Sequence, residues 1–587
     1  MKTLLTLTSV HYIEDDKKSR HRLRCRFAYS ILFLDAFVFV IEPVIRTVAH
    51  QAFGNLFVFV LIQAYITNIF LICLIENIEL ARVTAFGHLF LYCFLFFFLV
   101  HGYAQLSLVI PTKILQWPLD FCKIVVSFHL EMLRKNISCD RLNEEQTEGE
   151  NMQKFDDKNI VLSFAVMTDV HMCDSMGFDS RYKLKNAIDY TNEISLRDGR
   201  KLDAYCFVGD TLDRGLDYQA KMFGEVMLDN IKDNQKIFYC MGNHERLNHD
   251  EKAAILSIRK YLGEKYYEYD EEGQEEFIKG FRITHMGGHM FFAIQSDDYE
   301  APVKFNDDTL DYIDRKLAEE CKKNPNKYIF MFNHSMCYGT CYGSDLDGPD
   351  SLWNNTQLEK VLKKYPNVVI FGGHLHFPLN DERTIMQTDF TSVGAGCVTY
   401  MACENGNYEF MSGRTTMRDM LLFSQNLLCE LDKEGNLKIR RLDCFNRWEI
   451  KEPWVLESPK ADKEHLKKYT FDRGNDENNK APSLKGCSCT INEESDYGKV
   501  IMRVTFDAGT DDDLIHHYEL DSYENGEFVK QRRVLADFYK HRVPSEMRKS
   551  YTFRFADKEE GKRYGFKIRA VDSWGKKSED IIVGDID

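Results

Sequence analysis

The 587-residue chain lacks an excess of positive charge, because 91 Asp and Glu outnumber 75 Lys and Arg and give a formal net charge of −16. Phosphate polyanions would be repelled over most of such a surface, so no nucleic-acid-binding surface is expected. The 17 cysteines are an odd number without a regular spacing, and Cys206 and Cys240 lie inside apolar runs. Free thiols in such places act as small core residues. The cysteine pattern therefore favours a reducing compartment for the main body.

Charge is missing altogether from two long stretches near the N-terminus. Residues 47–75 and 83–112 contain no Asp, Glu, Lys or Arg, and each exceeds the roughly 20 apolar residues that cross a bilayer as a helix. A third candidate, at residues 27–45, contains Asp35 and Glu42, which are costly in lipid. We therefore expect a hydrophobic membrane region at residues 27–112 with two or three transmembrane helices, and hence a multi-pass membrane protein.

The orientation depends on the number of spans. The basic N-terminal tail at residues 1–26 ends in KKSRHRLRCR, which the positive-inside rule keeps in the cytoplasm. Two spans would leave the rest of the chain cytoplasmic, and three would place it outside the cytoplasm. The free thiols and the basic residues after the last span favour two. A second hypothesis is that residues 1–151 are not a genuine part of the protein and that the chain starts at Met152.

The middle of the chain alternates between two kinds of segment. Residues 113–157 are expected to be a juxtamembrane segment and linker, since the polar, acidic part is too poor in apolar residues to form a core. From residue 158 to 450, short apolar runs alternate with helix-compatible segments, and such alternation predicts an α/β domain with helices layered on a sheet. The predicted helices are 181–198, 217–232, 306–323 and 355–365.

The C-terminal part has a different texture. Residues 451–490 are interrupted by prolines and are predicted to be a linker, or an extension packed irregularly on the α/β domain. Residues 491–587 show apolar alternation at period two, which predicts a small all-β sandwich. Residues 564–575 resemble the penultimate strand of fibronectin type III domains. Domains of that kind bind or act as spacers, so contact with protein or carbohydrate is the role the resemblance implies. One face of that strand would carry Tyr564, Phe566, Ile568 and Ala570.

Five apolar runs of the α/β domain end in Asp, Asn or His, which are residue types that bind metal ions in proteins. Loops at the carboxyl edge of α/β sheets are common ligand sites, and residues two apart at a strand end point to the same side. Two divalent ions about 3.5–4 Å apart need a bridging carboxylate and a few nitrogen or oxygen ligands each. The run ends supply these donors: Asp169 and His171 in DVH, Asp210 in GDTLDRG, Asn243 and His244 in GNHE, His334 in NHS, and His374 and His376 in GGHLH.

In this order the blocks resemble the signature of calcineurin-like metallophosphoesterases: D-x-H, G-D-x-x-D, G-N-H-[DE], H and G-H-x-H. The resemblance runs from about residue 160 to about 450 and implies a four-layer α/β/β/α sandwich. It implies two divalent metal ions, manganese, iron or zinc, and hydrolysis of a phosphodiester or phosphomonoester by attack of a metal-bound hydroxide. The implied first metal is held by Asp169, His171 and His376, the bridge is Asp210, and the second metal is held by Asn243, His334 and His374.

The same resemblance makes His244 catalytic, either as the proton donor to the leaving oxygen or as a stabiliser of the transition state. Two further residues, Glu245 and Arg214, each have two possible roles. Glu245 either orients His244 or the adjacent turn, or is an exposed acid at a helix start. Arg214 either binds the substrate phosphate or forms a surface or structural salt bridge.

Departures from relatives bear on the substrate. Protein serine/threonine phosphatases carry an arginine immediately before G-N-H-E, where this chain has Met241, and they lack the paired histidines of GGHLH. Purple acid phosphatases place a tyrosine ligand three residues after the bridging Asp, where this chain has Asp213. The pattern is nearer the phosphodiesterase-like branch. Two other functions stay open: a catalytically silent, membrane-anchored binding protein that retains the fold, and a protein serine/threonine phosphatase.

Overall fold

The computed structural model describes residues 155–173, 180–197, 202–232, 234–247, 251–263, 280–298, 303–404, 414–416, 419–460, 463–496, 498–555 and 558–586. The predicted basic tail and membrane region lie outside these ranges, and so does the juxtamembrane segment up to residue 154. Within the described ranges, no helix combines the length and the apolar character that a membrane span needs. Residues 149–587 form one compact unit.

The first sheet of the α/β domain has seven strands in the order β16-β15-β14-β1-β2-β3, with β17 also paired to β15. Strands β1, β2 and β3 run parallel, and β14 is antiparallel to β1. The parallel strands are buried on both faces, which explains their nearly continuous apolar sequences. The bounds are β1 (Ile160–Met167), β2 (Ala204–Val208), β3 (Lys236–Cys240), β14 (Gln425–Asp432), β15 (Leu437–Asp443), β16 (Trp448–Glu449) and β17 (Trp454–Leu456).

The second sheet has six strands in the order β10-β11-β9-β6-β5-β4. Its central strands β11, β9, β6 and β5 are parallel. The bounds are β4 (Arg282–Met286), β5 (His289–Ala293), β6 (Ile329–Phe332), β9 (Val368–Gly372), β10 (Ile385–Gln387) and β11 (Thr391–Gly394). Short pairs form at β7 (Met336–Cys337) with β8 (Asn354–Asn355), and at β12 (Ala402–Glu404) with β13 (Arg414–Thr416).

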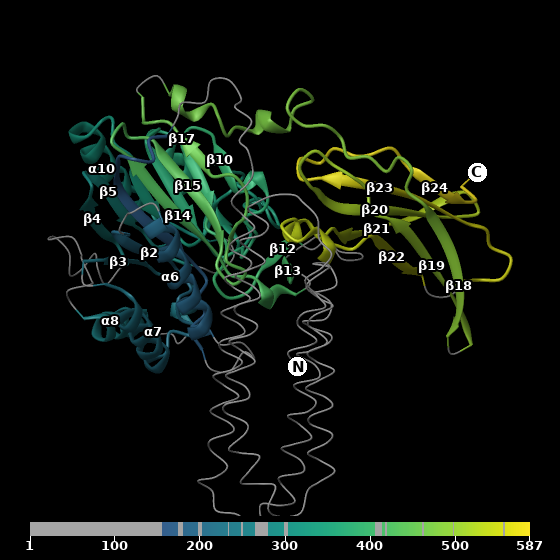
Figure 1. Cartoon of the computed structure of the whole chain (residues 1–587), viewed down its shortest axis with the longest axis horizontal. Coiled ribbons are helices and arrows are strands. Elements are labelled where there is room, and N and C mark those ends of the chain that lie inside the picture. The colour runs from purple at the N-terminus through teal and green to yellow at the C-terminus, as the bar shows by residue number, and fades with distance from the viewer. Residues whose placement is uncertain are drawn as a thin grey trace, which may run out of the picture. The chain divides into compact units, whose positions relative to one another are not determined.

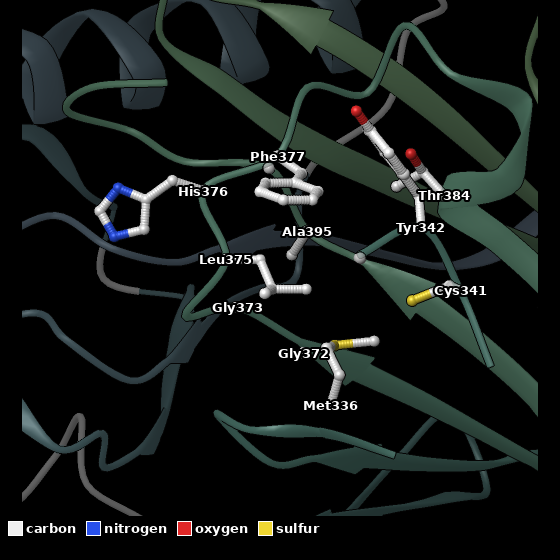
Figure 2. Close-up of a pocket in the computed structure, with 12 residues that line it drawn as sticks. Met336, Cys341, Tyr342, Gly372, Gly373, Leu375, His376, Phe377, Thr384 and Ala395 are labelled. Atoms are coloured by element: carbon white, nitrogen blue, oxygen red, sulfur yellow. The ribbon is translucent and has the colours of Figure 1, made fainter. Parts of the chain in front are cut away.

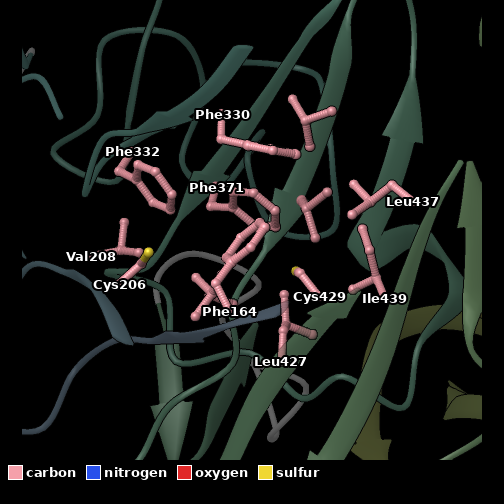
Figure 3. Packing of buried hydrophobic residues seen from close by; sticks show 14 of the residues in the cluster. Phe164, Cys206, Val208, Phe330, Phe332, Phe371, Leu427, Cys429, Leu437 and Ile439 are labelled. Carbon is pink, nitrogen blue, oxygen red and sulfur yellow. The ribbon is translucent and has the colours of Figure 1, made fainter. Parts of the chain in front are cut away.

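The two sheets face each other across an apolar layer, with helices on both outer sides (Figure 1). Phe164 of β1 lies with its ring centroid 4.9 Å from that of Phe330 of β6, and Figure 3 shows this packing. The next residue, Ala165, belongs instead to the outer cluster under the first set of helices, as period-two alternation requires. The order helix, sheet, sheet, helix agrees with the predicted four-layer α/β/β/α sandwich.

Four of the described helices overlap the four predicted segments, although Leu358–Leu362 is shorter than predicted, and the helix Glu251–Leu262 was not predicted. The described helices form two sets. Three of them, α6 (Ser180–Arg197), α7 (Asp217–Asn230) and α8 (Glu251–Leu262), cover the first sheet. The second sheet is covered by α10 (Asp307–Lys323) and α11 (Leu358–Leu362). Short 3-10 turns are η1 (His244–Arg246), η3 (Glu382–Thr384), η4 (Met420–Leu422), η5 (Glu464–Leu466), η6 (Phe471–Gly474), η7 (Phe538–Lys540) and η8 (Pro544–Glu546).

Residues 451–490, predicted as a linker or a packed extension, contribute to the α/β domain. Strand β17 pairs with β15, and Trp454 is 2% exposed in the layer between the sheets. The indole Nε1 donates a hydrogen bond to Glu382 Oε2 at 2.8 Å. The segment is therefore a packed extension at its start.

The C-terminal part forms an all-β sandwich, as predicted. A three-stranded sheet, β18-β19-β22, faces a four-stranded sheet, β21-β20-β23-β24. Phe566, Ile568 and Ala570 of β23 are fully buried between them, so the predicted face is the inner one. The bounds are β18 (Cys489–Asp496), β19 (Lys499–Asp507), β20 (Ile515–Glu524), β21 (Glu527–Leu535), β22 (Ser550–Phe555), β23 (Tyr564–Asp572) and β24 (Ile581–Gly584).

Candidate metal centre

The predicted ligands lie just beyond the ends of five strands. Because β1, β2 and β3 are parallel, their carboxyl ends meet at one edge of the first sheet, and β6 and β9 do the same in the facing sheet. The turns beyond these strands carry Asp169 and His171 after β1, Asp210 after β2, Asn243 and His244 after β3, His334 after β6, and His374 and His376 after β9.

The structure brings six of these side chains into two groups. One group is Asp169, His171 and His376, and the other is Asp210, His334 and His374; within each, one ligand atom per residue lies within 4.8 Å of the others. These are the two sets that the resemblance implies, apart from Asn243. In the first group, His376 Nε2 lies 2.9 Å from Asp169 Oδ1 and 3.2 Å from His171 Nε2.

Asp210 lies between the two groups, as expected for the predicted bridging ligand. Its Oδ2 is 3.0 Å from Nε2 of His334 in its own group and 4.0 Å from Nε2 of His171 in the other. All three side chains are almost fully buried. One carboxylate oxygen therefore faces ligands of both predicted metals.

Backbone carbonyls select the ring nitrogen that faces the centre. His334 Nδ1 lies 2.7 Å from Val208 O, and His376 Nδ1 lies 3.0 Å from Tyr400 O. A carbonyl only accepts, so these nitrogens carry the hydrogen, and in the neutral form of each ring Nε2 has the lone pair. His374 is held the other way round, with Nε2 3.0 Å from Leu352 O, which gives the lone pair to Nδ1.

The remaining predicted ligand, Asn243, also suits a metal. Its Oδ1 is buried and accepts no hydrogen bond from any residue in the described ranges. A buried amide oxygen in this state normally needs a partner. Together with the imidazole and carboxylate donors, it makes a set that fits manganese, iron or zinc.

Both carboxylates are oriented by backbone N–H groups from other loops. Asp169 Oδ2 accepts from the backbone N–H of His374 at 3.0 Å, and Asp210 Oδ1 accepts from that of His244 at 2.9 Å. In each case the second oxygen faces the histidines. Gly242 makes the second contact feasible, because a Cβ there would lie 2.2 Å from Asp210 Oδ1.

The ligand-bearing turns have unusual backbone conformations. Five predicted ligands have φ in the left-handed region: Asp169 at 53°, His171 at 45°, Asp210 at 49°, His374 at 70° and His376 at 60°. Non-glycine residues enter this region rarely, although Asp and His do so more readily than most. Such conformations cost about 1–3 kcal/mol each and persist where the surroundings impose them, typically at functional sites.

The surroundings of Glu245 exclude one of the two roles predicted for it. The residue is fully buried, so the alternative of an exposed acid at a helix start is wrong. Its carboxylate accepts from the backbone N–H groups of Asp210 at 3.1 Å, Leu212 at 2.8 Å and Gly242 at 2.7 Å. Burial and the nearby charge of Asp210 raise its pKa. Glu245 therefore fixes the turns after β2 and β3 to each other, which is the adjacent-turn role.

Replacing Glu245 is expected to destabilise the folded protein. In Glu245→Ala, three buried N–H groups lose their acceptor, and we expect the free energy of unfolding to fall by about 3 kcal/mol or more. Urea denaturation of the chelator-treated protein measures it. Glu464→Ala, which removes a carboxylate that is 49% exposed, is the control and should leave the midpoint in place. Equal midpoints for the two variants would contradict the role given to Glu245.

His244 has the geometry of a proton donor. Its Nδ1 donates to Asp213 O at 2.7 Å, its Nε2 lies 3.9 Å from Asp210 Oδ2, and the side chain is 28% exposed. The carbonyl fixes the ring, so Nε2 faces the Asp210 carboxylate and remains within reach of a ligand from solvent. His244 lies outside the two groups described above and forms a third one with His171 and Asp213.

Asp213 is a site residue to which no role was assigned from the sequence. Its Oδ1 lies 3.6 Å from His171 Nδ1 and 3.9 Å from His244 Nδ1. The interaction with His171 lowers the pKa of the carboxyl group. Asp213 is the second acid of the G-D-x-x-D block, and this was the sequence signal that could have identified it. Tyr400, whose ring centroid is 4.3 Å from that of His376, had no sequence signal.

Arg214 lies at the rim. Its side chain is 73% exposed, and Nε lies 3.6 Å from Asp213 Oδ2. An exposed pair at this distance contributes little to stability. The arrangement matches the surface salt bridge and leaves the guanidinium accessible to a substrate, so both predicted roles are compatible with the structure.

Carboxylates keep protons on two of the ligand histidines. Burial opposes charge on His171, but the neighbouring carboxylates of Asp169, at 3.7 Å, and Asp213, at 3.6 Å, outweigh burial and raise its pKa to about 10. Burial likewise opposes charge on His334, but the charge of Asp210 and the hydrogen bond to it raise its pKa to about 9. A metal ion binds the neutral ring, so its binding must displace these protons.

The metal-free protein is therefore expected to release about two protons per chain when manganese binds at pH 7. The raised pKa values stabilise the metal-free fold fully below about pH 6.5, and this contribution is lost as the pH rises through 9 and 10. Metal affinity should rise over the same interval. Titration calorimetry in buffers of different ionisation enthalpy measures the release, and an enthalpy independent of buffer would contradict it.

Comparison with known proteins finds 56 similar chains among solved structures, of which two follow, and no match among curated proteins. A purple acid phosphatase from yellow lupin (Lupinus luteus) seeds is 15% identical over 51% of this chain and 54% of its own, with a TM-score of 0.36. A putative 5′-nucleotidase from Staphylococcus aureus, in complex with alpha-ketoglutarate, is 14% identical over 52% of this chain and 57% of its own, with a TM-score of 0.30. This chain thus spans little more than half of either relative, and neither likeness indicates a substrate.

A family match is more direct. Residues 162–378 match the calcineurin-like phosphoesterase family. This range includes every predicted ligand as well as His244, and it ends before the C-terminal sandwich, so the fibronectin type III resemblance stays a prediction. Over these residues the chain is therefore similar to calcineurin-like phosphoesterases, the family that its five sequence blocks resemble.

Proposed function

We propose that the α/β domain hydrolyses a phosphoric ester with two divalent metal ions. The observation that carries the proposal is the position of Asp210, whose Oδ2 faces His334 at 3.0 Å and His171 at 4.0 Å. This places one carboxylate between two groups of metal-binding side chains. When bound, two such ions supply a nucleophile from water near neutral pH and neutralise phosphoryl oxygens.

The chain's own residues divide the remaining work. Asp169 and Asp210 are oriented by backbone N–H groups, and the histidines by backbone carbonyls, so the donors are positioned before any ion arrives. His244, with Nδ1 held by Asp213 O, would in its doubly protonated form transfer the proton on Nε2 to the departing oxygen and be left as the neutral ring. An alkoxide leaves poorly unless it is protonated, which makes this transfer valuable.

We propose a phosphodiester in preference to a phosphomonoester. A monoester dianion carries more negative charge and benefits from additional cationic side chains. Met241, in the position where protein serine/threonine phosphatases have arginine, is apolar and 1% exposed, within the cluster that lies under α6, α7 and α8. This position therefore brings no positive charge to the substrate.

Reconstitution of the purified protein tests the proposal. Chelator-stripped protein would be loaded with manganese and assayed with bis-p-nitrophenyl phosphate, p-nitrophenyl phosphate and a phosphopeptide. We expect hydrolysis that requires metal and is fastest for the diester. Binding of two metal equivalents without hydrolysis of any substrate would instead favour the silent binding protein, and preference for the phosphopeptide would favour a protein phosphatase.

We also propose that residues 27–112 anchor the protein in a membrane. Support comes from the two charge-free runs and from the basic residues that precede them. With two spans the phosphoesterase domain lies in the cytoplasm. Protease treatment of intact and opened cells tests this, because a cytoplasmic domain is cut only after opening, whereas three spans would expose it in intact cells.

A further inference from the structure

The loop that carries His374 and His376, defined here as the ligand loop (residues 373–380), has two sides. The two histidines face the metal-binding groups, whereas Leu375 and Phe377 belong to a separate apolar cluster. Figure 2 shows His376 and Phe377 pointing in different directions from the loop, with Tyr342 and Met336 near the small cavity behind it. The back of the ligand loop therefore depends on what fills this region.

The C-terminal sandwich supplies part of that filling. Tyr342, Leu375 and Phe377 are at most 5% exposed and share their cluster with side chains more than 130 residues later in the chain. The sandwich residues in the cluster are Leu514, Leu535, Phe538 and Tyr539, none more than 7% exposed. A fibronectin-like spacer would instead present polar surfaces to its neighbour and move relative to it.

A continuous series of contacts joins the ligand loop to the sandwich. The ring of Phe377 lies 4.8 Å from that of Tyr342, centroid to centroid. The Tyr342 hydroxyl hydrogen bonds to His516 Nε2 at 2.8 Å, and the His516 ring stacks on Phe538 at 5.2 Å and 24°. His516 is 4% exposed, so this hydrogen bond is not exchanged with water.

A second connection lies at the other end of the ligand loop. His541 Nε2 donates to Ile450 O at 2.8 Å, which leaves Nδ1 to accept from Asn380 Nδ2 at 2.9 Å. Asn380 Nδ2 also lies 3.4 Å from Tyr539 O. The turn η7 of the sandwich thus contacts the loop directly at Asn380, and it is connected to Phe377 through His516 and Tyr342.

We propose that the C-terminal sandwich is a structural part of the metal centre and that Tyr342, His516 and Phe538 are positioning residues for His374 and His376. Both histidines have left-handed backbone conformations, which persist only when surrounding contacts impose them. The sandwich supplies those contacts from behind the loop. This inference rests on the proposed function, since it concerns the metal ligands of that site.

Metal affinity of the full-length, chelator-stripped protein tests the inference, measured with manganese by titration calorimetry. We expect Phe538→Leu to weaken binding about tenfold, at the low end of the range for residues that orient metal ligands. Tyr342→Phe removes only one hydroxyl, and we expect a smaller loss of about threefold. Two matched controls make the same chemical changes inside the sandwich, away from the ligand loop. They are Phe553→Leu and Tyr518→Phe, whose side chains are 1% exposed in the sandwich core, and both should bind manganese within about twofold of the unaltered protein.

Thermal unfolding of the same proteins separates positioning from general stability. The controls should lower the midpoint of the metal-free protein as much as the interface variants do, without weakening metal binding. Unchanged affinity in both interface variants would overturn the inference. If Phe538→Leu fails to fold, Tyr342→Phe decides, because it removes one hydroxyl. Failure of the unaltered protein to bind manganese would refute the proposed function rather than the role of the sandwich.

Discussion

Asp210→Asn is expected to reduce kcat/KM by about 10³-fold or more, equivalent to roughly 4 kcal/mol of transition-state stabilisation. Asp210 Oδ2 faces histidines of both groups, so the substitution weakens the binding of both predicted metal ions at once. An amide keeps the acceptor for the backbone N–H of His244 and has nearly the same size. The loss should therefore arise from metal binding, measured by titration of the stripped protein alongside steady-state kinetics.

Asp189→Asn is the matched control for this prediction. It makes the same change on α6, where the carboxylate is 44% exposed and paired with Lys185. This variant should retain the activity and the metal stoichiometry of the unaltered protein. An active Asp210→Asn that still binds two metal ions would show that Asp210 does not bridge.

His244→Ala is expected to lose activity to an extent that depends on the leaving group. General acid catalysis contributes about 10²–10⁴-fold, so a diester with an alkyl leaving group should be hydrolysed about 10³-fold more slowly. A p-nitrophenolate leaves without protonation, and its release should slow far less. Metal affinity should change little, because His244 is not one of the predicted metal ligands. Rates for a series of leaving groups of different pKa measure the effect.

His285→Ala is the corresponding control. His285 lies on β4 with Nε2 3.1 Å from Glu320 Oε2, and its side chain is 42% exposed. Its replacement should leave the dependence on the leaving group unchanged. An equal loss for all leaving groups in His244→Ala would contradict proton donation and favour stabilisation of the transition state, the alternative role for this residue.

The positions of the predicted ligands followed from local sequence. Each run of buried strand residues ends in a polar block, and parallel strands deliver their ends to one edge of a sheet. Asp169 and Asp210 were therefore predictable as neighbours from the alternation alone. His334 follows a strand of the facing sheet, and its place beside them was implied by the family resemblance. The α/β alternation and the period-two pattern of the sandwich are local as well.

Other features depend on contacts between distant segments. Glu245 is followed by polar residues and looks like an exposed acid, yet it is buried because three backbone N–H groups from two turns converge on it. Strand β17 lies among prolines and pairs with β15 only because Trp454 fits between the sheets. The hydrogen bond between Tyr342 and His516 joins residues 174 positions apart. No spacing in the sequence encodes such contacts.

The left-handed backbone of the ligand turns has a consequence for how metal preference can change. Asp, Asn and His are among the non-glycine residues that tolerate this conformation best, and they are also the side chains that bind divalent ions. Exchanging one for another at His374 or Asp169 would alter the hardness of the donor set while leaving the turn intact. A β-branched replacement would disrupt both the turn and the binding of the metal. Retuning from one transition metal to another is thus accessible by single substitutions, without remodelling the loops.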